Sequence, residues 1–193
     1  MRVLLASFCV VFAAALPGFA DQPAAKPLEV GDKAPEFEVL DDQGKTWKSS
    51  EHFGKKLVVI YFYPADMTGG CTAQACAFRD DMGHLADKEV EVVGVSGDSV
   101  TSHQLFKRAH QLNFTLLADV YGKVADAFGV PKVVGERTVT TVIGDVTHEL
   151  TRSVTAQRWT FIVDRDGKIA YKDDRVNARQ DSQRVLQALE KLK

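Results

Sequence analysis

Residues 57–76 read LVVIYFYPADMTGGCTAQAC, and this stretch decides the fold. Its first seven residues form a continuous β-branched and aromatic run, which is typical of a central strand buried on both faces. Pro64 ends that strand, residues 65–70 form a loop, and apolar residues at helical spacing follow from Cys71 to Lys88. The stretch therefore predicts a buried strand, a tight loop and a helix that begins with a cysteine.

Strands and helices alternate along the rest of the chain. Residues 133–155 are rich in Val and Thr and match an extra hairpin that turns at Gly144 and Asp145. The order of elements predicts an α/β fold with a central mixed sheet flanked by helices. The other expected strands are 36–40, 45–48, 90–96, 115–117, 158–163 and 168–172, and the other expected helices are 100–112, 121–128 and 179–192.

The first twenty residues have the layout of a secretory signal peptide. Arg2 precedes an almost wholly apolar run from Val3 to Leu16, and Gly18 and Ala20 are the small residues that a cleavage site requires. The run is too short for an unstrained membrane span, and a retained interfacial anchor is the alternative. We expect export to a periplasm or out of the cell, with a signal peptide over 1–20, a linker over 21–28 and one domain over 29–193.

Composition narrows the function classes. With 193 residues, 45% apolar and 26% charged, the chain suits one ordinary globular domain. A formal net charge of −2 and the lack of a basic run argue against nucleic-acid or anionic-membrane partners. Cys9 falls in the predicted signal peptide, so the exported domain keeps Cys71 and Cys76. Two cysteines are too few for a fold that is stabilised by disulfides, and the pair is better suited to redox chemistry.

Cys71 has an electrostatic reason to be reactive. A helix N-terminus presents unpaired N–H groups and partial positive charge, which favours a thiolate over a thiol. Gly69 and Gly70 allow backbone amides to approach a small ligand, and Thr68 can place its hydroxyl beside the sulfur. Pro64 removes a backbone donor and stiffens the loop, which helps to keep water away. A thiolate in such a pocket can attack an O–O bond and become a sulfenic acid.

Cys76 is expected to resolve that sulfenic acid as a disulfide. Residues i and i+5 of an unbroken α-helix have Cα atoms about 8.6 Å apart, as follows from the rise and radius of the helix. A disulfide needs roughly 4.4–6.8 Å between the same atoms. The first turns of the helix must therefore unwind before Cys71 and Cys76 can join.

The motif Pro64-x-x-x-Thr68-x-x-Cys71 resembles the active site of the peroxiredoxins. Cys76, five positions further on, is similar to the peroxiredoxin Q, or bacterioferritin comigratory protein, subgroup, and the similarity covers most of residues 30–193. The resemblance implies a thioredoxin-like fold and peroxide reduction without metal, haem or another cofactor. It also implies recycling by a thioredoxin-like donor.

The same resemblance assigns roles to five residues. Cys71 matches the peroxidatic and Cys76 the resolving cysteine, Thr68 and Pro64 match pocket residues, and Arg158 matches the arginine that stabilises the thiolate and the peroxide. The expected substrates are hydrogen peroxide and organic hydroperoxides, and the expected form is a monomer or weak dimer. Two departures from the relatives are Gly69, where proline is frequent, and a longer segment before Arg158.

Simpler interpretations remain for the same residues. The two cysteines could form a structural disulfide or be two buried thiols, and Thr68 could serve only as a helix cap. Arg158 is the residue whose orientation the pattern leaves open. If Trp159, Phe161 and Val163 are the inward set of their strand, alternation turns Arg158 to the opposite face.

Two other functions use the same cysteines. An exported dithiol–disulfide oxidoreductase acting on protein thiols is one, although it would favour two intervening residues, where the present spacing has four. A copper-binding thioredoxin-like protein is the other, with His103 and His148 joining the cysteines, because thiolate and imidazole ligands suit copper.

Overall fold

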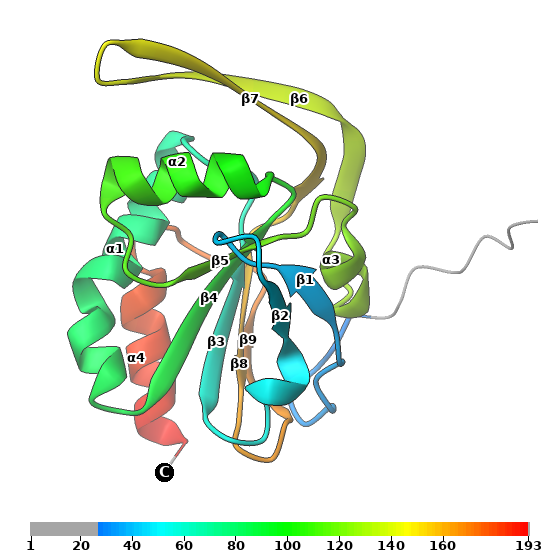
Figure 1. Ribbon diagram of the computed structural model, residues 1–193. Coiled ribbons are helices and arrows are strands. Elements are labelled where there is room, and N and C mark those ends of the chain that lie inside the picture. The colour runs from blue at the N-terminus through cyan, green and yellow to red at the C-terminus, as the bar shows by residue number, and fades with distance from the viewer. Residues whose placement is uncertain (1–26, 193) are drawn as a thin grey trace, which may run out of the picture.

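The computed structural model describes residues 27–192 (Figure 1). The predicted signal peptide and residues 21–26 of the predicted linker lie outside the described residues. The strands are β1 (Glu38–Leu40), β2 (Thr46–Lys48), β3 (Leu57–Phe62), β4 (Val90–Ser96), β5 (Thr115–Ala118), β6 (Lys132–Ile143), β7 (Val146–Ala156), β8 (Trp159–Val163) and β9 (Ile169–Asp173). The helices are a 3₁₀ turn over Ser49–Glu51 and α1 (Gly69–Ala86), α2 (Val100–His110), α3 (Lys123–Ala127) and α4 (Asp181–Lys191).

Five strands form the central sheet, in the order β5-β4-β3-β8-β9. The strands β3, β4 and β5 run parallel, whereas β8 pairs antiparallel with both β3 and β9. The mixed sheet predicted from the sequence is therefore confirmed. As expected of a strand covered on both faces, β3 is buried from Val58 to Phe62, and it occupies the middle of the sheet.

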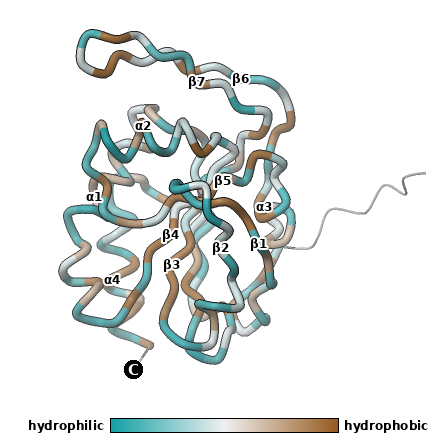
Figure 2. The backbone as a smooth tube through the Cα atoms, viewed as in Figure 1, coloured by the Kyte–Doolittle hydropathy of each residue, from teal (hydrophilic) through white to brown (hydrophobic). Residues whose placement is uncertain are grey.

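Each face of the sheet has its own apolar core. One core joins Val59, Tyr61 and Ile162 to residues of α1, α2 and α4, and the other joins Ile60 and Phe161 to α3 and to the β1–β2 hairpin. Figure 1 shows α1 and α4 side by side on the first face, and Figure 2 shows hydrophobic residues along the central strands. Since both faces are covered, alternation along a strand selects between two buried environments. Among residues 27–192, no helix is long and apolar enough to cross a membrane.

The active-site helix begins earlier than its apolar pattern predicts. It starts at Gly69, two residues before Cys71, because Thr68 is still extended (φ −86°, ψ 146°) and the glycines that follow are already helical. Cys71 is therefore the third helical residue. The prediction was wrong here because glycine has a poor helix propensity, yet the first turn needs few intrahelical hydrogen bonds.

The extra hairpin matched to residues 133–155 is confirmed. It is formed by β6 and β7, turns at Gly144 and Asp145, and extends over α2 (Figure 1). Its base packs tightly on the central domain, since a Cβ added at Gly97 would lie 2.2 Å from the carbonyl oxygen of Val154 on β7.

That close approach predicts opposite effects for two glycine substitutions. Gly97→Ala should lower the free energy of unfolding by about 1–3 kcal/mol, because β7 must move to admit the methyl group. Gly83→Ala should raise it by about 0.5–1 kcal/mol, because Gly83 lies within α1 with nothing within 4 Å of the added Cβ. Urea titration of the reduced protein measures both values. Equal shifts for the two variants would contradict the proposed packing of the hairpin.

Candidate active site

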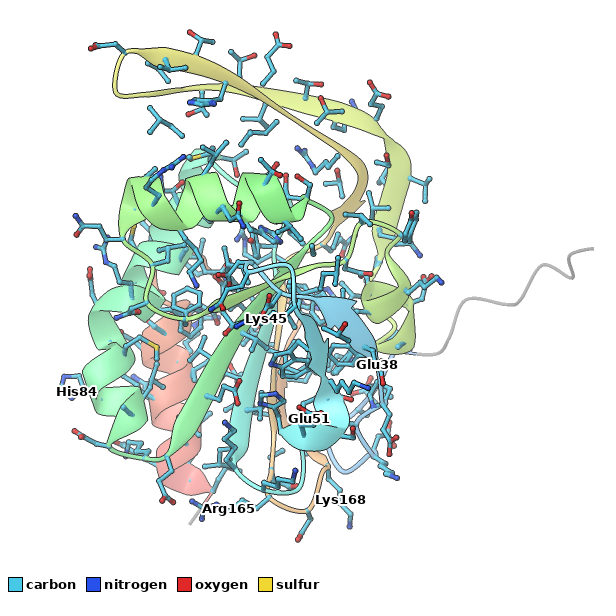
Figure 3. The ribbon with its side chains drawn as sticks, viewed as in Figure 1. Glu38, Lys45, Glu51, His84, Arg165 and Lys168 are labelled. Carbon is cyan, nitrogen blue, oxygen red and sulfur yellow. The ribbon has the colours of Figure 1, made fainter. Side chains whose placement is uncertain are left out.

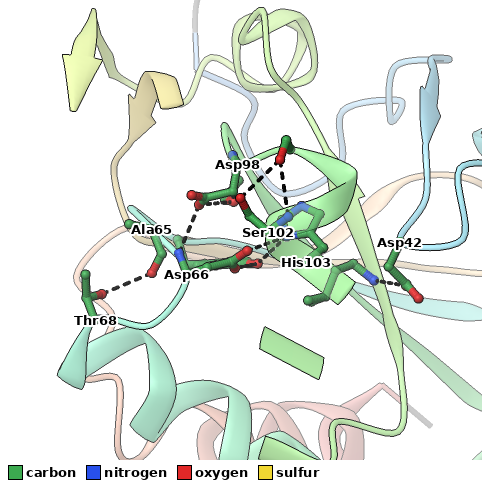
Figure 4. A network of polar contacts seen from close by, with 11 residues as sticks. Asp42, Ala65, Asp66, Thr68, Asp98, Ser102 and His103 are labelled. Carbon is green, nitrogen blue, oxygen red and sulfur yellow. Dashed lines mark hydrogen bonds and ion pairs between the residues drawn. The ribbon is translucent and has the colours of Figure 1, made fainter. Parts of the chain in front are cut away.

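Cys71 lies in the N-terminal turn of α1 and is only 2% exposed. The loop that leads to it leaves β3 at Tyr63 and includes Met67, whose left-handed backbone (φ 60°) is unusual for a residue other than glycine. Thr68 occupies the cap position, but its hydroxyl donates to the carbonyl of Ala65 at 3.0 Å and makes no cap bond to the helix (Figure 4). The hydroxyl oxygen of Thr68 therefore keeps its acceptor capacity.

Arg158 lies against the sulfur of Cys71. Its Nη2 atom donates to Cys71 Sγ at 3.2 Å, and its Nη1 atom donates to Oε1 of Gln74, one turn further along α1. The register between β3 and β8 explains why Arg158 lies beside Cys71, because Phe62 at the end of β3 is paired with Trp159 at the start of β8. The chain enters β8 beside the point where it leaves β3 toward Cys71.

Side chains of β8 alternate between two faces as predicted, but neither face is exposed to solvent. Trp159, Phe161 and Val163 do form one inward set, in the core beneath α3. The opposite face, with Thr160 and Ile162, is equally buried because α1 and α4 cover it. Residues of that second set point toward the active-site helix and away from solvent.

Behind Arg158 the polar contacts continue into the protein, through residues that the sequence analysis missed. Gln74 is fully buried, and its Nε2 atom donates to Oδ2 of Asp181 at 2.6 Å. Thr160 donates its hydroxyl to the same carboxylate oxygen at 2.8 Å. Burial is the main cause that raises the pKa of Asp181 to about 6, against hydrogen bonds from Gln74 and Thr160 that lower it. Gln74 follows Cys71 by three residues on the same helix face, a spacing that could have singled it out.

Both cysteines of α1 are free thiols in this structure. Cys71 is buried and Cys76 is partly exposed, and the helix runs unbroken through both of them from Gly69 to Ala86. The structure thus contains no structural disulfide between them. It shows the arrangement in which the two sulfurs are held apart by helical geometry.

A second buried network holds the loop before Cys71 in place (Figure 4). Asp66 accepts from the Tyr63 hydroxyl at 2.7 Å, and one of its carboxylate oxygens lies 2.8 Å from His103 Nδ1. The backbone N–H of Asp66 donates to Asp98 at 2.9 Å. Burial by itself would lower the pKa of His103, but Asp66, Asp98 and the backbone of Leu117 together outweigh burial, and the pKa is raised from 6.5. These contacts tie the loop to α2 and to the end of β4.

The copper interpretation required four side chains to come together. His103 is instead paired with Asp66, and His148 lies on the hairpin strand β7, where it pairs with Thr141 of β6. Among the described residues, no group of three or more His, Cys, Asp or Glu side chains could hold a metal ion. Other polar side chains, such as His84 on α1 and Arg165 beyond β8, point outward (Figure 3).

A pocket of about 410 Å³ borders the start of α1. Its walls come from the active-site loop and helix, from the end of α2 and from the tip of the β6–β7 hairpin. The lining residues are Met67, Gly69, Thr72, Ala109, His110 and residues 141–144. The hairpin thus gives the surface beside the Cys71 loop a partly apolar wall.

Comparison with known proteins gives a consistent result. The model of the AhpC/TSA family matches residues 30–172. The chain is 38% identical over 162 residues to peroxiredoxin Bcp of Bacillus subtilis, which covers 84% of this chain and 95% of that protein. It is 48% identical over 101 residues to the chloroplastic peroxiredoxin Q of Populus jackii, covering 52% of this chain and 47% of the relative.

The fold agrees with that relationship. A crystal structure of peroxidoxin BcpB from Mycobacterium tuberculosis is 30% identical, with a TM-score of 0.71 over 86% of this chain and 99% of that one. The mixed sheet flanked by helices is therefore the thioredoxin-like fold of the peroxiredoxins. The family match, the nearly full-length relative and the fold lead to one conclusion: the chain belongs to the AhpC/TSA family, as a thiol peroxidase of the peroxiredoxin Q, or bacterioferritin comigratory protein, subgroup.

Proposed function

We propose that the protein reduces hydrogen peroxide and organic hydroperoxides through a Cys71 sulfenic acid, which Cys76 resolves as an intramolecular disulfide. The observation that carries this proposal is the contact between Cys71 Sγ and Arg158 Nη2 at the N-terminal turn of α1. A guanidinium and the unpaired N–H groups of a helix start both favour negative charge on a sulfur that is otherwise buried.

In the first step the Cys71 thiolate attacks one oxygen of the peroxide. An S–O bond forms and the O–O bond breaks, which leaves a sulfenic acid and an alkoxide or hydroxide that takes up a proton. Arg158 stabilises the charge as it passes from sulfur to the leaving oxygen. The hydroxyl of Thr68 donates to Ala65, so its oxygen is free to accept the O–H of the peroxide. Pro64, half-buried at the end of β3, supports the loop and limits water.

In the second step the Cys76 thiolate attacks the sulfenic sulfur, an S–S bond forms, the S–O bond breaks, and the leaving hydroxide takes up a proton to become water. The two residues are five positions apart in the continuous helix α1, so the first turns of α1 must unwind. Partial exposure of Cys76 makes that sulfur accessible once the turn opens. A dithiol donor of the thioredoxin type then reduces the disulfide by exchange.

The pocket beside the active-site loop supports the use of organic hydroperoxides. Met67, Val142 and Ile143 line it, and they offer an apolar surface to the alkyl part of such a substrate. The same proposal places the protein outside the cytoplasm, on the strength of the signal-peptide pattern in residues 1–20. Its reductant would then be an exported thioredoxin-like protein.

Arg158 should control the reactivity of the Cys71 sulfur. In Arg158→Met, alkylation of Cys71 by iodoacetamide at pH 7 should slow about tenfold or more, because a charge-assisted hydrogen bond to the sulfur is lost. Arg158→Lys should recover part of the rate, since one ammonium cannot contact both Cys71 and Gln74 as the guanidinium does. Mass spectrometry of the peptide that carries Cys71 measures the rate. Arg165→Met, which removes an exposed arginine paired with Glu89, is the matched control. An unchanged rate in Arg158→Met would contradict the role of the contact.

Substitution of Cys71 and of Cys76 should stop the reaction at different steps. After stopped-flow mixing with hydrogen peroxide, the reduced wild type should consume peroxide and form one internal disulfide. Cys71→Ser should be inactive, and Cys76→Ser should stop at a sulfenic acid that a dimedone-type reagent traps. If the reduced wild type reacts no faster than a free thiol, the peroxidase mechanism proposed here is wrong.

The variant Gly69→Pro tests whether the first turns of α1 unwind. Gly69 is the first residue of α1, has no atom within 4 Å of an added Cβ, and follows Thr68, whose extended backbone tolerates a proline after it. Gly69→Pro should therefore stabilise the protein by about 0.5–1 kcal/mol and slow disulfide formation relative to sulfenic acid formation. Acid-quenched time courses measure both steps. Gly83→Ala stabilises the same helix outside its first turns, and it should leave the ratio of the two rates unchanged.

A further inference from the structure

A line of polar contacts, partly buried at Arg158 and fully buried beyond it, runs from the sulfur of Cys71 to the start of α4. Cys71 Sγ accepts from Arg158 Nη2, Arg158 Nη1 donates to Gln74 Oε1, and Gln74 Nε2 donates to Asp181 Oδ2. Gln74 and Asp181 are both fully buried. The line joins residues more than a hundred positions apart, from α1, from the segment before β8 and from α4.

The order of donors and acceptors in this line is set by chemistry. A guanidinium carries only donors, so Arg158 can be anchored only by the oxygen of the Gln74 amide. The amide nitrogen must then face an acceptor on its other side. Asp181 supplies that acceptor when it is ionised, and Thr160 completes the arrangement by donating to the same carboxylate oxygen.

Protonation of Asp181 would weaken this order. The second carboxylate oxygen, Oδ1, is buried and has no hydrogen-bond partner among residues 27–192, so it is the atom that a proton would occupy. Oδ2 would still accept from Gln74, but as an uncharged carbonyl oxygen, and the hydrogen bond that orients the amide would be weaker. A neutral carboxyl group can also donate, so the turned-over amide, whose nitrogen would face the guanidinium, is no longer excluded.

We propose that Asp181 is a positioning residue, whose ionised carboxylate orients Gln74 and thereby holds Arg158 against the Cys71 sulfur, and whose protonation weakens that hold. The inference rests on the proposed function of Cys71 and adds a regulatory element to it. Asp181 itself touches neither the sulfur nor the substrate site.

The electrostatic surroundings fit this role. Burial raises the pKa of Asp181 to about 6, so the carboxylate is mostly ionised at pH 7.5 and mostly protonated at pH 5. Asp173 on β9 raises that pKa further, and Arg158 lowers it. The two tyrosines nearby stay neutral throughout this range, since burial raises the pKa of each. The charged and titratable groups that face Asp181 are Arg158, Asp173 with its partner Arg184, Tyr61 and Tyr171, and Cys71 lies beyond Arg158.

The raised pKa of Asp181 also makes the stability of the fold depend on pH. A carboxyl group whose pKa is raised by folding stabilises the folded state below its unfolded value of 3.8, and that contribution is lost as the pH rises through 6. At pH 7.5 the ionised Asp181 therefore opposes folding. Asp181→Asn, which is isosteric and neutral, should be at least as stable as the wild type at that pH.

The test is the pH dependence of Cys71 alkylation by iodoacetamide, read from the peptide that carries Cys71. Between pH 7.5 and pH 5, the logarithm of the wild-type rate should fall more steeply with pH than that of Asp181→Asn, because only the wild type loses the ionised carboxylate over this range. In Asp181→Asn the rate at pH 7.5 should be about threefold to tenfold lower. Asp119→Asn is the control, since Asp119 is a buried carboxylate that accepts hydrogen bonds from the backbone N–H groups of Val124 and Ala125. Its pH profile should match the wild type.

A double variant reverses the donor order and serves as rescue. In Gln74→Glu with Asp181→Asn, the new carboxylate at position 74 can accept from Arg158 and from the amide of position 181. The alkylation rate at pH 7.5 should then return to within about twofold of the wild type. It also serves as the test if Asp181→Asn alone fails to fold. A wild-type profile in Asp181→Asn, or no recovery in the double variant, would overturn the inference. Because alkylation needs no peroxide, a failure of the proposed peroxidase activity would appear separately, in the stopped-flow assay.

Discussion

The contact between the Arg158 guanidinium and the Cys71 sulfur is the interaction on which the rest of the structure depends. A sulfur that is 2% exposed cannot carry negative charge without a partner, because an unpaired buried charge costs several kcal/mol. The fold supplies the partner through strand register, since Phe62 pairs with Trp159 and brings the chain before β8 beside the start of α1. The core beneath α1 and α4 then excludes water from the same place.

The helix that we propose activates Cys71 also keeps it away from Cys76. Helix geometry holds the two Cα atoms about 8.6 Å apart, beyond the reach of a disulfide. The proposed mechanism therefore requires N-terminal turns that are stable enough to stabilise the thiolate and weak enough to unwind after oxidation. Gly69 and Gly70 satisfy the second condition, because glycine lowers helix stability. The loop before them is anchored by Asp66 and His103, so unwinding has a fixed boundary on that side.

Much of this was accessible from the sequence, because local patterns determine local structure. The apolar run of β3, the break at Pro64 and the pair of cysteines predicted the sheet centre and the reactive loop, and the turn at Gly144 predicted the extra hairpin. The partial burial of Arg158 and the contacts of Gln74 and Asp181 were not accessible in this way. They depend on α1, β8 and α4 packing together, and nothing local at Asp181 distinguishes it from any acidic residue at the start of a helix.

The most direct test of the account is amide hydrogen exchange of the reduced and the peroxide-oxidised protein, resolved to peptides. The account predicts that residues 69–76 are protected in the reduced protein and lose protection once the Cys71–Cys76 disulfide has formed, while β3 and β4 stay protected in both states. Formation of that disulfide with unchanged protection over residues 69–76 would contradict it, because an intact helix cannot bring the two sulfurs together.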